Sequence, residues 1–167
     1  MLSLPQEGPC RDQRLRLTLP ADMAQVRHAM VLLHRFWIRA GMDVASTEKA
    51  GLVLAEVLNN VVEHACSDDP AALVWLDISR CAGVLDIVVT DSGRPIPDAR
   101  LPDATMPGIP REIENLPEGG FGWPLIWRLA RSVTYQRVGG WNRLHLELQC
   151  FPGAGTKPDV QGNAAIF

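Results

Sequence analysis

The stretch LAEVLNNVVEHA, from Leu54 to Ala65, is apolar enough for a buried helix, yet it carries two carboxylates, two carboxamides and an imidazole. Glu56, Asn60 and His64 are spaced at i, i+4 and i+8, so an α-helix places them along one face. A solvated polar face is the simplest explanation for such a helix taken alone. Asparagine is a poor residue for a helix interior, however, and two stand side by side here. This mixture of residue types favours a metal–phosphate site.

A second motif, DSGRP from Asp91 to Pro95, directly follows the apolar run LDIVVT. An aspartate followed by glycine at a strand end is a common turn. The functional alternative is a carboxylate held at a sheet edge, where it can accept a hydrogen bond from an exocyclic amine such as that of adenine. Gly93 would then let a planar base approach the backbone.

A third motif, GGFG from Gly119 to Gly122, precedes a short apolar helix that has Pro124 in its first turn. Proline is favourable at a helix start because its missing N–H would be unpaired there. A glycine-rich loop that leads into a helix N-terminus offers backbone amides and the positive end of the helix dipole to an anion. The alternative is a flexible hinge.

Composition and charge narrow the class of protein. The chain has 167 residues, of which 47% are hydrophobic and 21% charged, which is typical of one globular domain. The net charge of −3 and the scattered arginines disfavour direct contact with nucleic acid. The four cysteines have no spacing typical of a zinc site or a disulfide framework. Without an apolar signal segment or a membrane span, we expect a cytoplasmic protein.

The periodicity of the chain predicts the order β-α-α-β-β-lid-α-β-β. This order argues for an α+β protein, a two-layer sandwich in which a mixed sheet has helices on one face. Residues 94–118 carry six of the 13 prolines and form a long connection of the kind that often serves as a lid. The strands are expected over 14–19, 73–79, 84–90, 133–137 and 143–151. The helices are expected from Asp22 to Gly41, from Ser46 or Thr47 to Cys66, and from the glycine loop to Ala130.

Two common nucleotide-binding frameworks are absent from the sequence. The only lysines are Lys49 and Lys157, and neither lies in a GxxxxGK[ST] loop. The HRD and DFG motifs of ordinary protein kinases are missing as well. A chain of this kind that handles ATP must therefore use a different phosphate cradle.

The three motifs in this order resemble the GHKL ATPases, and within them most closely the anti-sigma-factor serine kinases of the RsbW/SpoIIAB type. The resemblance rests on EVLNNVVEHA at 56–65, DSGRP at 91–95 and LPEGGFGWPLIWRLARSVTY at 116–135, and it extends from about Leu15 to Leu148. It implies a Bergerat fold, with a mostly antiparallel sheet and an ATP lid at 94–118. We expect a flexible N-terminus over 1–13, a kinase domain over 14–151 and a tail over 152–167.

The resemblance also implies roles for individual residues. Glu56 would act as the general base, and Asn60 would hold Mg²⁺ against the triphosphate of ATP. Asp91 would receive the adenine amino group, with Gly93 lining the base pocket. Asn142 lies nearest to the position where the family often carries a threonine that helps to bind adenine. The residues of the phosphate loop would be Gly120, Phe121 and Gly122.

One departure from the family concerns charge near the γ-phosphate. Some relatives carry a basic residue just before the glycine loop, where this chain has Glu118. An arginine of the lid is then the candidate for charge compensation, and a solvated position is the alternative for each of them. These arginines are Arg94, Arg100 and Arg111.

The activity that the resemblance implies is that of an ATP-dependent serine-protein kinase. Such a protein phosphorylates an anti-anti-sigma partner of the STAS type, binds a sigma factor and forms a homodimer. A catalytically idle anti-sigma module with the same fold is the alternative. The catalytic half of a histidine kinase is disfavoured because neither His28 nor His34 is followed by the usual acidic residue and proline. A structural protein that binds no nucleotide would require three coincident motifs.

Overall fold

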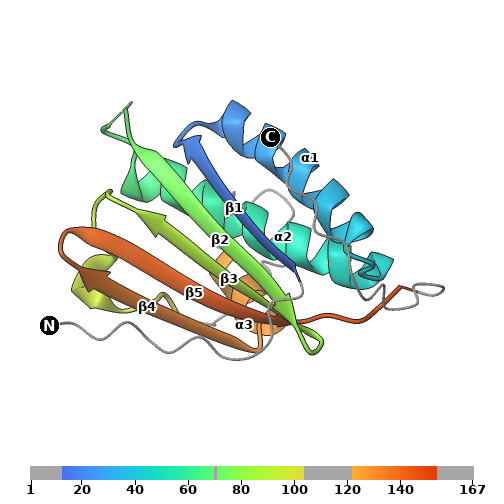
Figure 1. The fold of residues 1–167 in the computed structure, drawn as a ribbon. Helices are drawn as coiled ribbons and strands as arrows, with labels where there is room; N and C mark the ends of the chain where they lie inside the picture. The colour runs from blue at the N-terminus through green and yellow to red at the C-terminus, as the bar shows by residue number, and fades with distance from the viewer. Residues whose placement is uncertain (1–12, 70, 104–121, 154–167) are drawn as a thin grey trace, which may run out of the picture.

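The computed structural model describes residues 13–69, 71–103 and 122–153 (Figure 1). Their order confirms the predicted succession of strands and helices. A 3₁₀ turn over Pro97–Ala99 and a π-helical turn over Val61–Ala65 add to it. The strands are β1 (Gln13–Pro20), β2 (Leu73–Cys81), β3 (Val84–Asp91), β4 (Ser132–Val138) and β5 (Trp141–Gln149). The helices are α1 (Met23–Arg39), α2 (Val44–Asn60) and α3 (Gly122–Leu129).

The five strands form one sheet in the order β1-β2-β3-β5-β4. All four pairings are antiparallel, in agreement with the expected mostly antiparallel sheet, and no parallel pair occurs among the described strands. Between β1 and β2 the chain passes along α1 and then back along α2. It therefore re-enters the sheet at the same end from which it left, and β2 runs antiparallel to β1. Pro20 at the end of β1 therefore lies opposite Leu73 at the start of β2.

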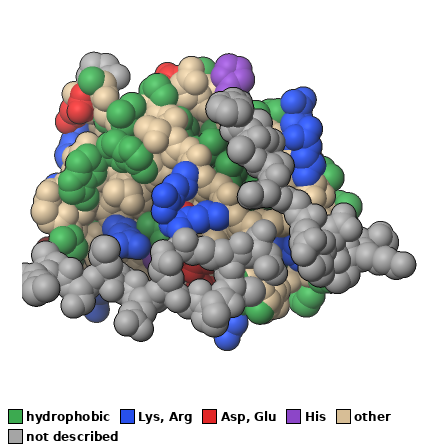
Figure 2. All heavy atoms as spheres, viewed as in Figure 1, with side chains coloured by type: hydrophobic (Ala, Val, Ile, Leu, Met, Phe, Trp, Pro, Cys, Tyr) green, Lys and Arg blue, Asp and Glu red, His purple; other side chains and the backbone are tan. Residues whose placement is uncertain are grey.

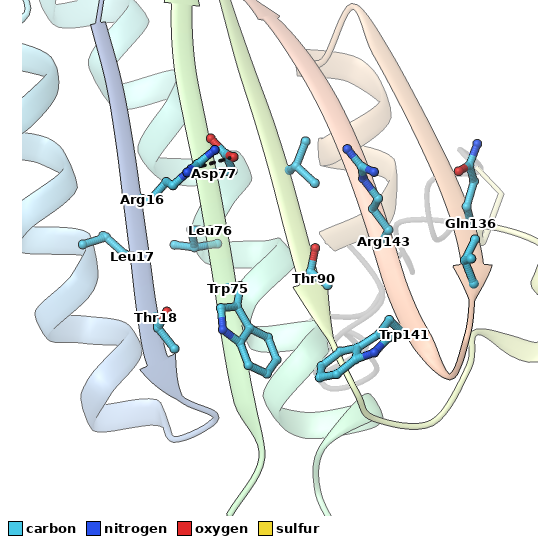
Figure 3. A pocket seen from close by; sticks show the side chains of 12 residues that line it. Arg16, Leu17, Thr18, Trp75, Leu76, Asp77, Thr90, Gln136, Trp141 and Arg143 are labelled. Atoms are coloured by element: carbon cyan, nitrogen blue, oxygen red, sulfur yellow. Dashed lines mark hydrogen bonds and ion pairs between the residues drawn. The ribbon is translucent and has the colours of Figure 1, made fainter. Parts of the chain in front are cut away.

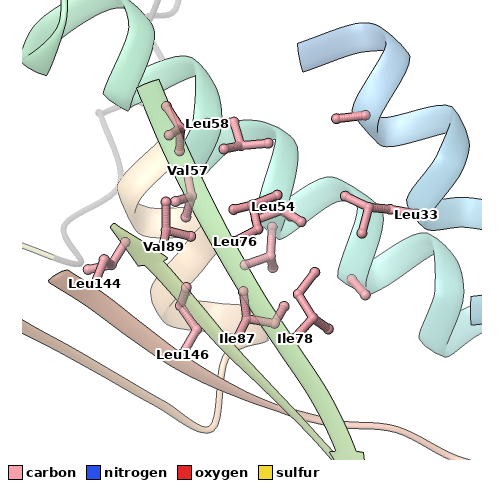
Figure 4. Close-up of a cluster of buried hydrophobic side chains, with 14 of the residues drawn as sticks. Leu33, Leu54, Val57, Leu58, Leu76, Ile78, Ile87, Val89, Leu144 and Leu146 are labelled. Atoms are coloured by element: carbon pink, nitrogen blue, oxygen red, sulfur yellow. The ribbon is translucent and has the colours of Figure 1, made fainter. Parts of the chain in front are cut away.

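The helices cover one face of the sheet and leave the other face open (Figure 1). Burial alternates along the central strands, and Leu85, Ile87 and Val89 of β3 are at most 1% exposed. Figure 4 shows Leu54 and Leu58 of α2 among the buried side chains of this core. The alternation means that odd-numbered residues of β3 face the helices and even-numbered residues face outward.

The N-cap of α1 lies where the sequence predicted it, but α2 differs at both ends. Asp22 caps α1 by accepting from two backbone amides. The cap of α2 is Asp43, whose Oδ1 accepts from Ser46 N at 2.7 Å, so the helix begins earlier than the predicted Ser46 or Thr47. Both of those residues are buried in its first turn. The α-helical hydrogen bonding stops at Asn60, and the predicted last turn is the π-helical one.

The β4–β5 hairpin is closed by two glycines. Gly139 and Gly140 have φ angles of 60° and 88°, as a two-residue type I′ turn requires. This turn sets the register in which Arg137 lies opposite Asn142. The register becomes important for the site described below.

The predicted lid and glycine loop are only partly described. Residues 94–103 belong to the described part, while the remainder of the lid, together with Gly120 and Phe121, lies outside it. At the other end of the domain, Pro152 forms a β-bridge with Met42. None of the helices in the described ranges is both long and apolar enough to cross a membrane.

Asp22 tests the contribution of a helix cap to this fold. Its Oδ1 accepts from Ala24 N at 2.8 Å and from Gln25 N at 3.2 Å. We expect Asp22→Ala to lower the free energy of unfolding by about 1 kcal/mol, because both amides lose this acceptor. Asp22→Asn keeps an acceptor and is the matched control. Urea unfolding followed by circular dichroism measures both variants, and an equal loss in both would contradict the capping role.

Candidate functional site

The loop after β3 lies directly against the π-helical turn at the end of α2. Arg94 N donates to Ala65 O at 2.8 Å. A Cβ on Gly93 would lie 2.9 Å from Ala65 Cβ and closer still to the Ala65 carbonyl group, so only glycine fits this contact. The close approach at Gly93 is therefore made with the backbone of the helix end, and the approach of a planar base to this glycine stays a prediction.

Asp91 is held just before this contact and is only 4% exposed. Its Oδ1 accepts from Gly93 N at 2.8 Å and from Asn142 Nδ2 at 2.7 Å, and the Cys66 thiol lies 4.0 Å away. Oδ2 has no hydrogen-bond partner among the residues that the structure describes. Burial raises the pKa of the Asp91 carboxyl group, against the hydrogen bonds from Asn142 and Gly93, which lower it. The buried site thus offers one unused carboxylate oxygen.

The Cys66 thiol remains neutral beside this carboxylate. Burial, and secondarily the charge of Asp91, raise the pKa of Cys66 to about 11. A thiol with such a pKa stays protonated at neutral pH and adds no second negative charge to the site.

Asn142 lies behind Asp91 and uses its whole carboxamide group within the protein. Its Oδ1 accepts from Tyr135 Oη at 2.7 Å and from Arg137 at 2.6 Å. These two donors fix the orientation of the amide, so that Nδ2 must face Asp91 and the Arg94 carbonyl, the latter at 2.9 Å. The structure therefore places Asn142 where it positions Asp91, without a polar group left over for a ligand.

The sequence reasoning missed two residues of this network, Tyr135 and Arg137. Besides binding Asn142, Tyr135 Oη accepts from Ile96 N at 3.1 Å, and Arg137 donates to Gly93 O at 2.9 Å. The β4–β5 hairpin thereby holds the loop after β3. The two residues stand at i and i+2 on one face of β4. The two glycines that follow this strand were the available signal, because a two-residue turn fixes the hairpin register and so brings both residues near Asn142.

Glu56 and Asn60 lie next to the start of α3. A Cβ on Gly122 would lie 2.7 Å from Glu56 Oε2 and 3.8 Å from Asn60 Nδ2. Asn60 Nδ2 is buried and lacks a hydrogen-bond partner within the described ranges. Because a buried polar atom without a partner is energetically costly, this amide is suited to a bound polar ligand.

A cavity of about 410 Å³ joins these elements. Its polar lining includes Asn60, His64, Asp91 and Asn142, and apolar side chains such as Trp123 complete the walls. The volume is in the usual range for a small-molecule site. Glu56 is not among the lining residues and lies beside Asn60, next to α3. The cavity therefore brings together two of the three sequence motifs, while the third contributes Gly122 at its margin.

The arginines that we considered for phosphate contacts have different surroundings. Arg94 lines the cavity but forms an ion pair with Asp68 and a 3.0 Å hydrogen bond to Ser67 Oγ. Arg100 is exposed, and Arg111 lies outside the described residues.

A larger hollow of about 630 Å³ lies on the open face of the sheet (Figure 3). Trp75 and Trp141 meet there edge to face, with ring centroids 4.9 Å apart, and Arg16 is paired with Asp77. Figure 2 shows hydrophobic side chains on the left of this face and Lys or Arg side chains near its middle. None of the residues that the sequence singled out lines this hollow, so the smaller cavity is the candidate site.

Comparisons with known proteins agree with this geometry. Residues 19–148 match the family described as histidine kinase-like ATPase domain. The serine/threonine-protein kinase BtrW of Bordetella bronchiseptica is 28% identical over 97 residues, which cover 58% of this chain and 66% of BtrW. The crystal structure of the RsbU and RsbW domains of a Mycobacterium tuberculosis protein has a TM-score of 0.58 at 16% identity, covering 84% of this chain. This likeness confirms the expected Bergerat-type fold.

The matched regions cover only part of each relative. The alignment spans slightly less than two thirds of BtrW, and the structural match covers 33% of the Mycobacterium tuberculosis chain.

Gly93 and Gly122 give contrasting predictions for alanine substitution. A Cβ at Gly93 meets rigid backbone at Ala65, so we expect Gly93→Ala to lower the free energy of unfolding by about 1–3 kcal/mol. A Cβ at Gly122 meets only the end of the flexible Glu56 side chain, so we expect a change within about 0.5 kcal/mol. Urea unfolding of both variants tests this, and a Gly93→Ala protein as stable as the unsubstituted chain would refute the contact.

The raised pKa of Asp91 predicts a pH-dependent stability. The folded protein binds the Asp91 proton more tightly than the unfolded chain, so ionisation destabilises the fold as the pH rises through the folded-state pKa. Asp91→Asn keeps an oxygen acceptor for Gly93 N without the charge. We expect this variant to exceed the unsubstituted protein in unfolding free energy at neutral pH, with a difference that shrinks on acidification. Urea titrations over a series of pH values measure this difference in unfolding free energy. A difference that grows towards acid pH would contradict a raised pKa of Asp91.

Proposed function

The chain belongs to the histidine kinase-like ATPase domain family, and from this premise we propose that it is an ATP-dependent serine-protein kinase that also acts as an anti-sigma factor. Membership of an ATPase domain family implies ATP binding, and we propose the cavity as its site. The finer proposal is a partner-switching system: phosphorylation of a serine on a STAS-type anti-anti-sigma protein, and binding of a sigma factor when that partner is absent.

The adenine end of the site is proposed at Asp91. The unused Oδ2 of this carboxylate is an acceptor for the exocyclic amino group of adenine, and the apolar walls of the cavity suit the faces of a base. Guanine carries a carbonyl oxygen at the corresponding ring position and would meet the carboxylate unfavourably. Asn142, Tyr135 and Arg137 support this preference by holding Asp91 in one orientation.

The phosphate end is proposed beside Glu56 and Asn60. The observation that carries the proposal is the buried Nδ2 of Asn60, which has no hydrogen-bond partner among the described residues and lies next to Glu56 and the first residue of α3. With the amide turned by 180°, its carbonyl oxygen becomes available as a ligand for Mg²⁺, which prefers oxygen donors and few protein ligands. Mg²⁺ would neutralise phosphate charge there. Gly120 and Phe121 are assigned to the proposed phosphate loop from their position in the sequence motif alone.

The chemical step requires mainly positioning and one proton acceptor. Glu56 would accept the proton of the serine hydroxyl as the serine oxygen bonds to the γ-phosphorus. The bond between that phosphorus and the β–γ bridging oxygen breaks, and ADP leaves. Gly122 has no side chain, so the start of α3 can lie against Glu56 without displacing it.

The identity of the partners rests on the relatives. BtrW is named a serine/threonine-protein kinase, and the structural relative contains an RsbW domain. These names support a protein substrate and a regulatory partner. We propose a homodimer that uses α1 or the edge of β1, and no contact with DNA or membranes.

The proposal predicts that Glu56→Gln loses phosphoryl transfer to the protein substrate and retains ATP binding. We expect phosphorylation of a STAS-type protein with Mg-ATP to fall about 100-fold or more, because the proton acceptor is lost. ATP affinity measured by calorimetry should remain close to that of the unsubstituted chain. Asp91→Asn is the contrasting variant, which should lose ATP binding while remaining folded.

The same assay separates the competing functions. ATP binding without transfer from the unsubstituted chain would favour the idle anti-sigma module. Alkali-stable phosphate on a histidine, which persists when the serine of the partner is changed to alanine, would favour the histidine-kinase alternative. No heat with adenine nucleotides would refute the site itself.

A further inference from the structure

We propose that Asp86, His145 and Glu147 form a binding site for a divalent transition metal of the zinc class on the open face of the sheet. The ligating atoms of these three residues lie within 4.8 Å of one another. The site is separate from the proposed ATP site, because the sheet lies between them.

The register of β3 and β5 brings the three side chains together. Asp86 lies directly opposite Glu147, and His145 is two residues from Glu147, on the same face of β5. Figure 3 shows Arg143 of the same strand on the open face, and His145 follows it at the next outward position. The neighbouring Leu144 and Leu146 are buried on the helix side. The cluster thus stands on two inner strands of the sheet, where the backbone is held on both sides.

The charges of the cluster favour a bound cation. Two carboxylates that face each other directly across a strand pair repel one another. Among the cross-strand neighbours, Ser79 lies opposite Asp86, Ser132 opposite Glu147 and Thr134 opposite His145, and all three are neutral. The His145 ring contacts Asp86, with Nε2 at 2.7 Å from Asp86 Oδ2. This hydrogen bond leaves the Glu147 carboxylate without a directly opposed basic side chain on β3 or β4.

The donor set indicates the class of metal. One imidazole nitrogen and two carboxylate oxygens suit Zn²⁺ and related ions, with water in the remaining position. Mg²⁺ prefers oxygen donors alone and keeps its water, so it should compete poorly. The side chains of His145 and Asp86 are 34% and 41% exposed, which leaves the site open to metal from solution. Bound metal would link β3 to β5 and stabilise their pairing.

The test is titration of the full chain with Zn²⁺ by calorimetry after treatment with a chelator, without nucleotide and with excess Mg²⁺ present. We expect saturable binding that weakens by about tenfold or more in Glu147→Gln, which leaves the Asp86–His145 pair intact. His145→Gln should weaken binding as well, while the matched control His34→Gln, at an exposed position of α1, should not. The imidazole resonances of His145 should shift with Zn²⁺ in the unsubstituted protein.

Each outcome decides the proposal. Equal Zn²⁺ affinity in the unsubstituted chain, Glu147→Gln and His145→Gln would overturn it, as would the absence of saturable binding. A Zn²⁺-dependent rise in melting temperature that is lost in Glu147→Gln would support it. If Glu147→Gln melts like the unsubstituted protein with chelator and no variant responds to Zn²⁺, the cluster contains only the hydrogen bond between His145 and Asp86, and the proposal is overturned.

Discussion

The arrangement of the site depends on one close contact, that of the Gly93 backbone with the carbonyl end of the π-helical turn at Ala65. It sets the distance between the end of α2, which carries Asn60, and the end of β3, which carries Asp91. A longer side chain at position 93 would separate the two elements and open the cavity. The π-helical turn contributes by widening the helix at the point where the loop arrives, as such turns often do near functional sites.

A chain of hydrogen bonds extends this constraint to the far edge of the sheet. Arg137 and Tyr135 of β4 hold the carboxamide of Asn142, and Asn142 in turn holds Asp91. Both β4 residues also bind the backbone of the loop after β3. The hairpin therefore supports a buried carboxylate that lines the cavity. A polar network of this kind specifies one geometry because its hydrogen bonds orient each member.

The sheet separates two surfaces with different chemistry. Residues that face the helices form the apolar core and the cavity that we assign to ATP. Residues that face outward include the Trp75–Trp141 pair and the proposed metal cluster around His145. Strand alternation is the physical reason that Asn142 and His145, three residues apart on β5, serve different faces. One strand can therefore contribute to two sites without compromising either.

The sequence alone was sufficient for the order of the elements and the cap of α1, and the resemblance to the GHKL ATPases suggested the roles that we propose for Glu56, Asn60 and Asp91. These features depend on local periodicity, on capping chemistry and on motifs read along the chain. Only the tertiary structure decided the antiparallel return of β2, the π-helical end of α2, and the burial of Asn142 behind Asp91. Each of these depends on contacts between segments far apart in the sequence. The Asp86–His145–Glu147 cluster belongs to the same class, because strand register across β3 and β5 brings its members together.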